Sequence, residues 1–151
     1  MISVQMAETG PVELAVIRRR VQRSQLSTVV PQTCGLVWSF VREHQIPAGR
    51  HVALYLNGAI DVEVGVEVTG SFEEEGDVVH SSTPSGLVAS AVHFGPYHQL
   101  GAVHSAIQSW CKANGHRLAG PNWEIYGHWQ SDWDKNPAQI RTDVFYQISR
   151  P

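Results

Sequence analysis

The feature that most constrains this chain is a set of landmarks that recur after a nearly constant interval of 71–73 residues. The recurring pairs are Leu14 with Leu87, Trp38 with Trp110, and Tyr55 with Tyr126. A regular offset across three separate landmarks is typical of a duplicated structural unit. We therefore expect two copies of one unit, over residues 12–69 and 87–149, joined by a connector over residues 70–86.

Each copy is predicted to run strand, helix, strand, strand. Residues 12–20 and 86–93 have the composition of strands, and an apolar stripe with helical spacing follows each of them. The stripe residues are Cys34, Val37, Trp38 and Val41 in the first copy and Leu100, Val103, His104, Ile107 and Cys111 in the second. Asn114-Gly115 is expected to end the second helix. The closing strands are predicted at residues 52–56, 60–68, 123–128 and 140–148, and residues 130–139 lengthen the last hairpin.

Tandem β-α-β-β units predict an α+β fold in which antiparallel sheets carry helices on one face. The opposite sheet faces can then be covered only by each other. A seam between two similar halves is a common place for a ligand groove. The chain has 151 residues, so we expect a single domain over residues 1–151 with a central ligand groove between its halves.

Charge and hydropathy exclude several classes of partner. The net charge of -3 and the pI near 6.2 provide no general attraction to phosphate backbones, so we expect no direct binding of nucleic acid. The basic run at residues 18–20 and the acidic run at residues 73–75 are interpreted as solvated surface. The sequence shows no leader pattern at its start and no apolar stretch long enough for a membrane helix, so a cytoplasmic protein without membrane contact is expected.

The cysteines and histidines do not form a metal motif. Cys34 and Cys111 lack C-x-x-C spacing, and such a pair in a reducing compartment is typical of buried free thiols. The eight histidines contain no H-x-x-x-H or H-E-x-x-H arrangement. Cys34 and His44 are too far apart on one helix to act as nucleophile and base. We therefore expect no metal and no cofactor.

One predicted strand concentrates side chains that can carry chemistry. In residues 123–128, alternation places Trp123 and Ile125 on one face and Glu124, Tyr126 and His128 on the other. If the first face packs on the helices, the second is directed into the groove. By the 71-residue offset, Tyr55 corresponds to Tyr126 and Ala53 corresponds to Glu124. The carboxylate therefore belongs to one half only.

A single carboxylate among aromatic rings suits a flat organic cation, because ring faces attract positive charge. The same residues also suit a general acid or base, because burial against rings raises a carboxyl pKa. Alternatively, Glu124 is an exposed strand residue or is paired with Arg141. Trp38 and Trp110 are interpreted as core or groove floor, and Trp129 and Trp133 as a lip over the groove.

The segments Val92-His93-Phe94-Gly95-Pro96-Tyr97, Ala119-Gly120-Pro121-Asn122-Trp123-Glu124-Ile125-Tyr126 and Arg141-Thr142-Asp143-Val144 resemble the GyrI-like small-molecule-binding family, also described as the effector-binding domain of AraC- and MerR-type regulators. The resemblance covers nearly the whole chain. It implies a groove that binds drugs and dyes, often cationic and aromatic, with Glu124 as the key acidic group. The ligand-binding residues expected on this basis are Glu124, Tyr126, Tyr55, Tyr97, Trp38, Trp110, His128 and Phe94.

The resemblance leaves three functions open. The protein could sequester or sense a hydrophobic or cationic small molecule, and without a helix-turn-helix segment it would do so as a stand-alone domain. Some relatives resemble hydrolases that open electrophilic cyclopropane rings, in which case Glu124 and Tyr126 would be catalytic. Other relatives resemble inhibitors of DNA gyrase, which would make the acidic run at residues 73–75 a protein-binding face.

Overall fold

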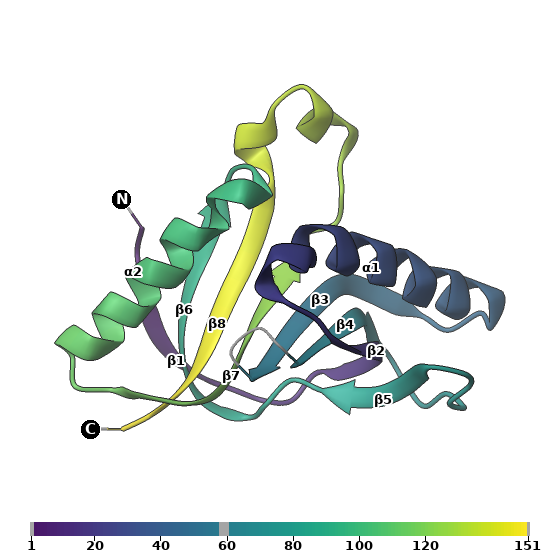
Figure 1. The fold of residues 1–151 in the computed structure, drawn as a ribbon, viewed down its shortest axis with the longest axis horizontal. Coiled ribbons are helices and arrows are strands. Elements are labelled where there is room, and N and C mark those ends of the chain that lie inside the picture. Colours follow the sequence, from purple (N-terminus) through teal and green to yellow (C-terminus); the bar gives the residue numbers. More distant parts are fainter. Residues whose placement is uncertain (1, 58–60, 151) are drawn as a thin grey trace.

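Eight strands form one antiparallel sheet, and two α-helices lie on the same face of it (Figure 1). This α+β arrangement is the one predicted. The computed structural model describes residues 2–57 and 61–150. The elements are β1 (Gln5–Thr9), β2 (Glu13–Arg20), α1 (Leu26–Glu43), β3 (Ala48–Asn57), β4 (Asp61–Val68), β5 (Val78–Ser82), β6 (Gly86–Phe94), α2 (Leu100–Ala113), β7 (Arg117–Tyr126) and β8 (Arg141–Ser149).

The order of elements repeats along the chain, because β2-α1-β3-β4 is followed by β6-α2-β7-β8. Within the sheet the strands are arranged β1-β6-β8-β7-β3-β4-β2-β5. β3 and β7 are the third elements of their sets, and they are neighbours at the centre of the sheet. Pairing between them joins the strands of both sets into a single sheet rather than two separate ones.

Two strands were not expected from the sequence, and both lie at the sheet edges. β5 lies within residues 70–86, which the pattern indicated to be only a connector, and it pairs with β2. β1 precedes the first predicted unit and pairs with β6. Four of its five residues are exposed, so it lacks the buried alternation that marks a strand in a sequence. Hydrogen bonding to an existing edge, rather than apolar burial, accounts for it.

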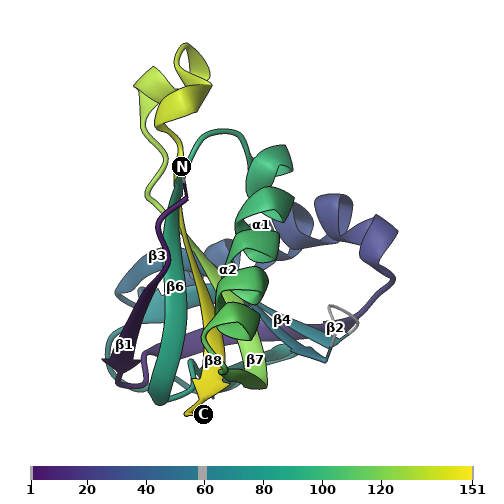
Figure 2. The same cartoon turned by 90° about the vertical axis from the view of Figure 1, so that its left-hand side faces the viewer.

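The apolar stripes of both helices pack onto the sheet. Val37 and Val41 of α1 and Val103 and Ile107 of α2 are at most 2% exposed. Figure 2 shows α2 running along the strands of its own half, with α1 on the same side of the sheet. α2 ends at Asn114, and Gly115 follows with a positive φ of 75°, as Asn-Gly predicts. Trp38, assigned to the stripe of α1, is instead 39% exposed.

The face opposite the helices is filled by side chains from both ends of the sheet. One buried cluster consists of Leu14, Val16, Val52, Leu54, Val88, Trp123 and Ile125. Its members come from β2, β3, β6 and β7, so curvature of the sheet brings the distant strands β2 and β6 against one core. The two halves close on each other as the helix positions predict, but side chains fill the seam, where the sequence analysis had placed the ligand groove.

The same cluster corrects the predicted orientation of β7. Trp123 and Ile125 do not pack under the helices, because they belong to the core on the opposite face. Glu124 and Tyr126 therefore lie on the helix-bearing face. Alternation fixes which residues share a face, but it does not determine which of the two faces the helices cover.

Candidate functional site

The carboxylate of Glu124 is the centre of a buried hydrogen-bond cluster on the helix-bearing face. Glu124 is 5% exposed. Its Oε1 accepts hydrogen bonds from the hydroxyls of Tyr126 at 2.6 Å and Tyr55 at 3.1 Å. Its Oε2 accepts a hydrogen bond from Nε2 of His104 at 2.6 Å. The structure thus brings together Glu124, Tyr126 and Tyr55, which the sequence analysis had grouped, and adds a histidine that it had assigned to a helix stripe.

A chain of hydrogen bonds behind His104 holds its ring in position. Nδ1 of His104 lies 2.7 Å from the hydroxyl of Tyr146, and Nε2 of Gln108 donates to the same hydroxyl oxygen at 3.2 Å. The hydroxyl of Tyr146 therefore contacts both Gln108 and His104, and it holds the imidazole in place from the side opposite Glu124. Nε2 of His104 donates to the carboxylate of Glu124.

The surroundings favour the ionised form of Glu124. Burial by itself would raise the pKa of the carboxyl, but the hydrogen bonds from His104, Tyr126 and Tyr55 outweigh it and the pKa is lowered. Burial, with the neighbouring Glu124 charge, raises the pKa of both Tyr55 and Tyr126. The two phenols therefore remain protonated donors near neutral pH. Arg141 pairs with Asp143 at 3.0 Å, so it is not the partner of Glu124 that the sequence allowed.

Strands β3 and β8 lie on either side of β7, and their residues in register with Glu124 and Tyr126 extend the cluster into a patch of three strands. Ala53 of β3 and Val144 of β8 face Glu124 in register, and His51 and Thr142 face Tyr126 in the same way. The small side chain of Ala53 leaves the Glu124 carboxylate free to reach Tyr55. Tyr97, which follows β6, packs edge-on against Tyr126 with ring centroids 5.6 Å apart, and it is 43% exposed. Tyr97 is thus the side chain through which this cluster reaches the surface.

Three other predicted ligand-binding residues lie near the edge of this patch or outside it. Trp38 packs against the ring of His51 at 5.7 Å. Phe94 is 61% exposed beneath the guanidinium of Arg141. Trp110 stacks on His116 at 5.4 Å near the end of α2, and no hydrogen bond or ring contact joins it to the Glu124 cluster in the described residues.

The long hairpin between β7 and β8 contains the remaining aromatic candidates. His128 is exposed and lies two residues beyond the end of β7 at Tyr126. Trp129 and Trp133 pack together with centroids 5.4 Å apart. Only Trp129 is exposed, because Trp133 is 5% exposed and contacts Gly127. Trp133 therefore anchors the hairpin, and only Trp129 is available as a lip.

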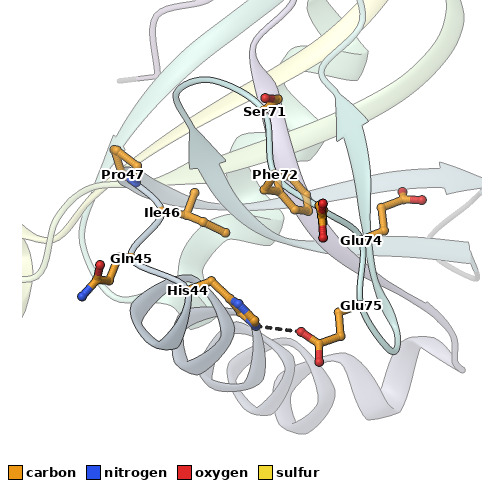
Figure 3. A pocket seen from close by; sticks show the side chains of 9 residues that line it. His44, Gln45, Ile46, Pro47, Ser71, Phe72, Glu74 and Glu75 are labelled. Carbon is orange, nitrogen blue, oxygen red and sulfur yellow. Dashed lines mark ion pairs between the residues drawn. The ribbon is translucent and has the colours of Figure 1, made fainter.

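A separate hollow of about 540 Å³ lies between the end of α1 and the segment before β5 (Figure 3). It contains the acidic run that the sequence offered as a protein-binding face. Glu75 pairs with His44 at 2.8 Å, and Glu74 accepts a hydrogen bond from the backbone N–H of His80 at 2.7 Å. Two of the three carboxylates are thus bound to neighbouring groups of the same chain.

The cysteines are not reactive nucleophiles. Cys34 and Cys111 are free, and burial raises the pKa of Cys34 to about 11 and raises that of Cys111 as well. Cys34 is half-buried rather than fully buried. Within residues 2–57 and 61–150 no three histidine, cysteine, aspartate or glutamate side chains are grouped as metal ligands are. None of the helices in that part of the chain is long and apolar enough to cross a membrane.

Comparison with known proteins places this geometry in a family. The family model of the GyrI-like small molecule binding domain matches residues 11–149. A search among curated proteins gives no match.

Several solved structures share the fold at low sequence identity. The C-terminal domain of EcmrR aligns with a TM-score of 0.83 and 18% identity over 100% of this chain and 99% of that one. SAV2435 bound to tetraphenylphosphonium aligns with a TM-score of 0.65 and 15% identity over 97% and 94%. A hydrolase encoded by lin2189 from Listeria innocua aligns with a TM-score of 0.60 and 8% identity over 97% and 91%.

Proposed function

Because this chain belongs to the GyrI-like small molecule binding domain family, we propose that it binds a flat aromatic cation and that the charge of Glu124 selects the ligand. The observation that carries the proposal is a buried carboxylate whose pKa is lowered, so that it is ionised. Among the described residues, no lysine or arginine pairs with Glu124, and its only ion-pair neighbour is His104. A buried carboxylate without a lysine or arginine partner favours a ligand that supplies positive charge.

The aromatic surroundings favour a flat, delocalised cation over a small hydrated one. Tyr55, Tyr126 and Tyr97 place rings around or above the carboxylate. Faces of such rings attract a cation by about 0.5–2 kcal/mol. A small inorganic cation would have to lose its water shell without gaining enough oxygen ligands. The neighbour SAV2435 was solved with tetraphenylphosphonium, a cation that has aromatic rings, although these rings are arranged tetrahedrally around phosphorus and do not lie in one plane.

Binding requires that the tyrosine cover opens. Both oxygens of Glu124 are occupied by internal donors in the described structure. Tyr97 has the outermost ring and packs on Tyr126 only by its edge. Rotation of Tyr97, followed by Tyr126, would let a flat ring lie against the carboxylate while His104 continues to hold Oε2. Sequestration or sensing of such compounds then needs no chemical step.

The test compares two ligands of the same shape and different charge. We would measure binding of the cation 10-methylacridinium and of the neutral 10-methylacridone to the wild type and to Glu124→Gln. Loss of a charge-assisted interaction of about 1.5–3 kcal/mol should weaken the cation about ten- to hundredfold and the neutral compound little. Glu63→Gln is the matched control, because Glu63 is an equally buried carboxylate that binds Arg18 and Ser81 away from the site.

Each other outcome has a defined reading. Equal weakening of both compounds would mean that Glu124 shapes the site without selecting charge. Failure of both to bind the wild type would refute the proposal. Mass analysis of the recovered ligand distinguishes binding from turnover, because consumption of an electrophilic compound that stops in Glu124→Gln would favour the hydrolase alternative.

A further inference from the structure

A second set of polar atoms lies next to the Glu124 cluster and has no role in it. His51 of β3 and Thr142 of β8 flank Tyr126 in register, on the same sheet face as Glu124. Tyr126 is two residues beyond Glu124 on β7, which corresponds to about 7 Å along an extended strand. The polar groups of His51 and Thr142 thus form a row one step along the sheet from the carboxylate.

Both side chains contain a buried polar atom without a partner. Oγ1 of Thr142 and Nδ1 of His51 make no hydrogen bond to any described residue. Thr142 is 0% exposed, so its hydroxyl is fully removed from solvent. Buried polar groups in native proteins are nearly always hydrogen-bonded, because leaving one unpaired destabilises the fold. The stability of the fold alone does not explain why these two unpaired groups are present. A bound ligand would supply the missing hydrogen-bond partners.

Both side chains can accept a hydrogen bond. Burial lowers the pKa of His51, against a backbone hydrogen bond with Gly65 that raises it, so the ring is neutral near pH 7 and one of its two nitrogens is a lone-pair acceptor. The threonine hydroxyl can accept as well as donate. Two exposed rings contact the row, with Trp38 5.7 Å from His51 and Tyr97 5.6 Å from Tyr126. A flat ligand ring that packs against these aromatics would lie next to the row.

We propose that His51 and Thr142 form a polar subsite that accepts hydrogen bonds from N–H groups on the ligand. The ligand class is then narrower than an aromatic cation. It is an amino-substituted fused-ring cation whose N–H groups lie about 7 Å from the point nearest to Glu124. This inference rests on the proposed binding of aromatic cations at Glu124, and it adds the position and kind of hydrogen-bonding group.

The test uses proflavine and acridine orange, two cations with the same three fused rings. Proflavine has free amino groups, and in acridine orange these are fully methylated and have no N–H. The wild type should prefer proflavine. Thr142→Val removes the hydroxyl and keeps the shape, and it should reduce this preference roughly two- to tenfold, the effect of one hydrogen bond. His51→Phe, which keeps a flat ring, should reduce the preference similarly.

Stability provides an independent readout. Because the Thr142 hydroxyl has no partner, Thr142→Val should melt at the same temperature as the wild type or higher. Thr33→Val is the matched control, since Thr33 is equally buried and its hydroxyl donates to the carbonyl of Val29 at 2.7 Å. Thr33→Val should lower the melting temperature and leave the preference for proflavine unchanged.

The possible failures are separable. If 10-methylacridinium binds in a Glu124-dependent manner but the preference for proflavine is absent or unaffected by Thr142→Val and His51→Phe, only the subsite is refuted. A fall in melting temperature of Thr142→Val as large as that of Thr33→Val would also refute it, because the hydroxyl would then have an internal partner. If no acridine binds the wild type, the subsite and the proposed function both fail.

Discussion

Glu124 faces Ala53 across the two central strands, and these two residues are also separated by the 71-residue offset that separates Tyr55 from Tyr126. A rotation that exchanged the two halves by that offset would therefore exchange Ala53 with Glu124, and its axis would pass between them. A side chain at this position adjoins both halves equally. One carboxylate is enough there, and a second would lie directly opposite the first, where like charges repel. We accordingly expect the two halves to superpose with Tyr55 over Tyr126.

The first prediction concerns the acid stability that Glu124 provides. Its pKa is lowered from the ordinary value of 4.5 in the folded protein. The ionised form therefore stabilises the fold fully above that value, and this contribution is lost as the pH falls through the folded pKa. Relative to Glu124→Gln, the wild type should be more stable by roughly 1–3 kcal/mol at neutral pH. The difference should decrease below pH 4.5.

Urea denaturation at several pH values measures this difference. Glu8→Gln is the control, because Glu8 is an exposed carboxylate paired with Arg150 at 3.3 Å, and exposed pairs contribute little. A stability difference for Glu124→Gln that grew as the pH fell would contradict the assigned hydrogen bonds.

The second prediction tests the packing of α2. Ile107 is 0% exposed in the cluster between α2 and the sheet, so Ile107→Ala should reduce the free energy of unfolding by about 2–5 kcal/mol. Leu36→Ala on α1 is the control, because Leu36 is 53% exposed and should change stability by less than about 0.5 kcal/mol. Similar denaturation midpoints for the two variants would show that the helix is rotated from the position described.

The third prediction concerns the close contact of β4 with β2. A Cβ at Gly65 would lie 1.8 Å from the carbonyl oxygen of Ala15 and 2.8 Å from Cα of Val16. Both contacts are with backbone, so the strands would have to separate, and Gly65→Ala should cost roughly 3 kcal/mol or more. Gly101→Ala is the opposite case.

Nothing lies within 4 Å of a Cβ at Gly101 in α2, and alanine there should stabilise the protein by about 0.5–1 kcal/mol. Thermal melts of the two variants should therefore shift in opposite directions. A tolerated Gly65→Ala would mean that β2 and β4 are not packed as described.

The sequence predicted the elements that bury an apolar pattern and missed those that do not. The helices and six strands have periodic apolar side chains, so their existence could be predicted. The bounds of two strands were wrong, because β3 (Ala48–Asn57) and β7 (Arg117–Tyr126) begin before the predicted 52–56 and 123–128, in segments whose Gly and Pro residues indicated turns. β1 and β5 are edge strands, and β1 is mostly exposed, so its formation depends on the unpaired edge of β6. That edge exists only after the sheet has formed, and no local pattern records it.

Two of the three side chains that donate to Glu124 were also predictable. The offset that relates Tyr55 to Tyr126 led to the two phenols that donate to Glu124. His104 could not be separated from the apolar residues of its stripe, because helical spacing does not show which stripe position faces a polar group. The error in the orientation of β7 had the same origin, since strand alternation is identical on either face of the sheet.

The burial of the Glu124 carboxylate, which is 5% exposed among Tyr55, Tyr126 and His104, has a kinetic consequence. Any ligand that reaches the carboxylate must wait until the tyrosines that cover it have moved aside. The observed association rate should therefore rise with ligand concentration only until it equals the rate at which the tyrosines depart, and then level off. Different ligands of the proposed class should share that limiting rate, because it is a property of the protein alone.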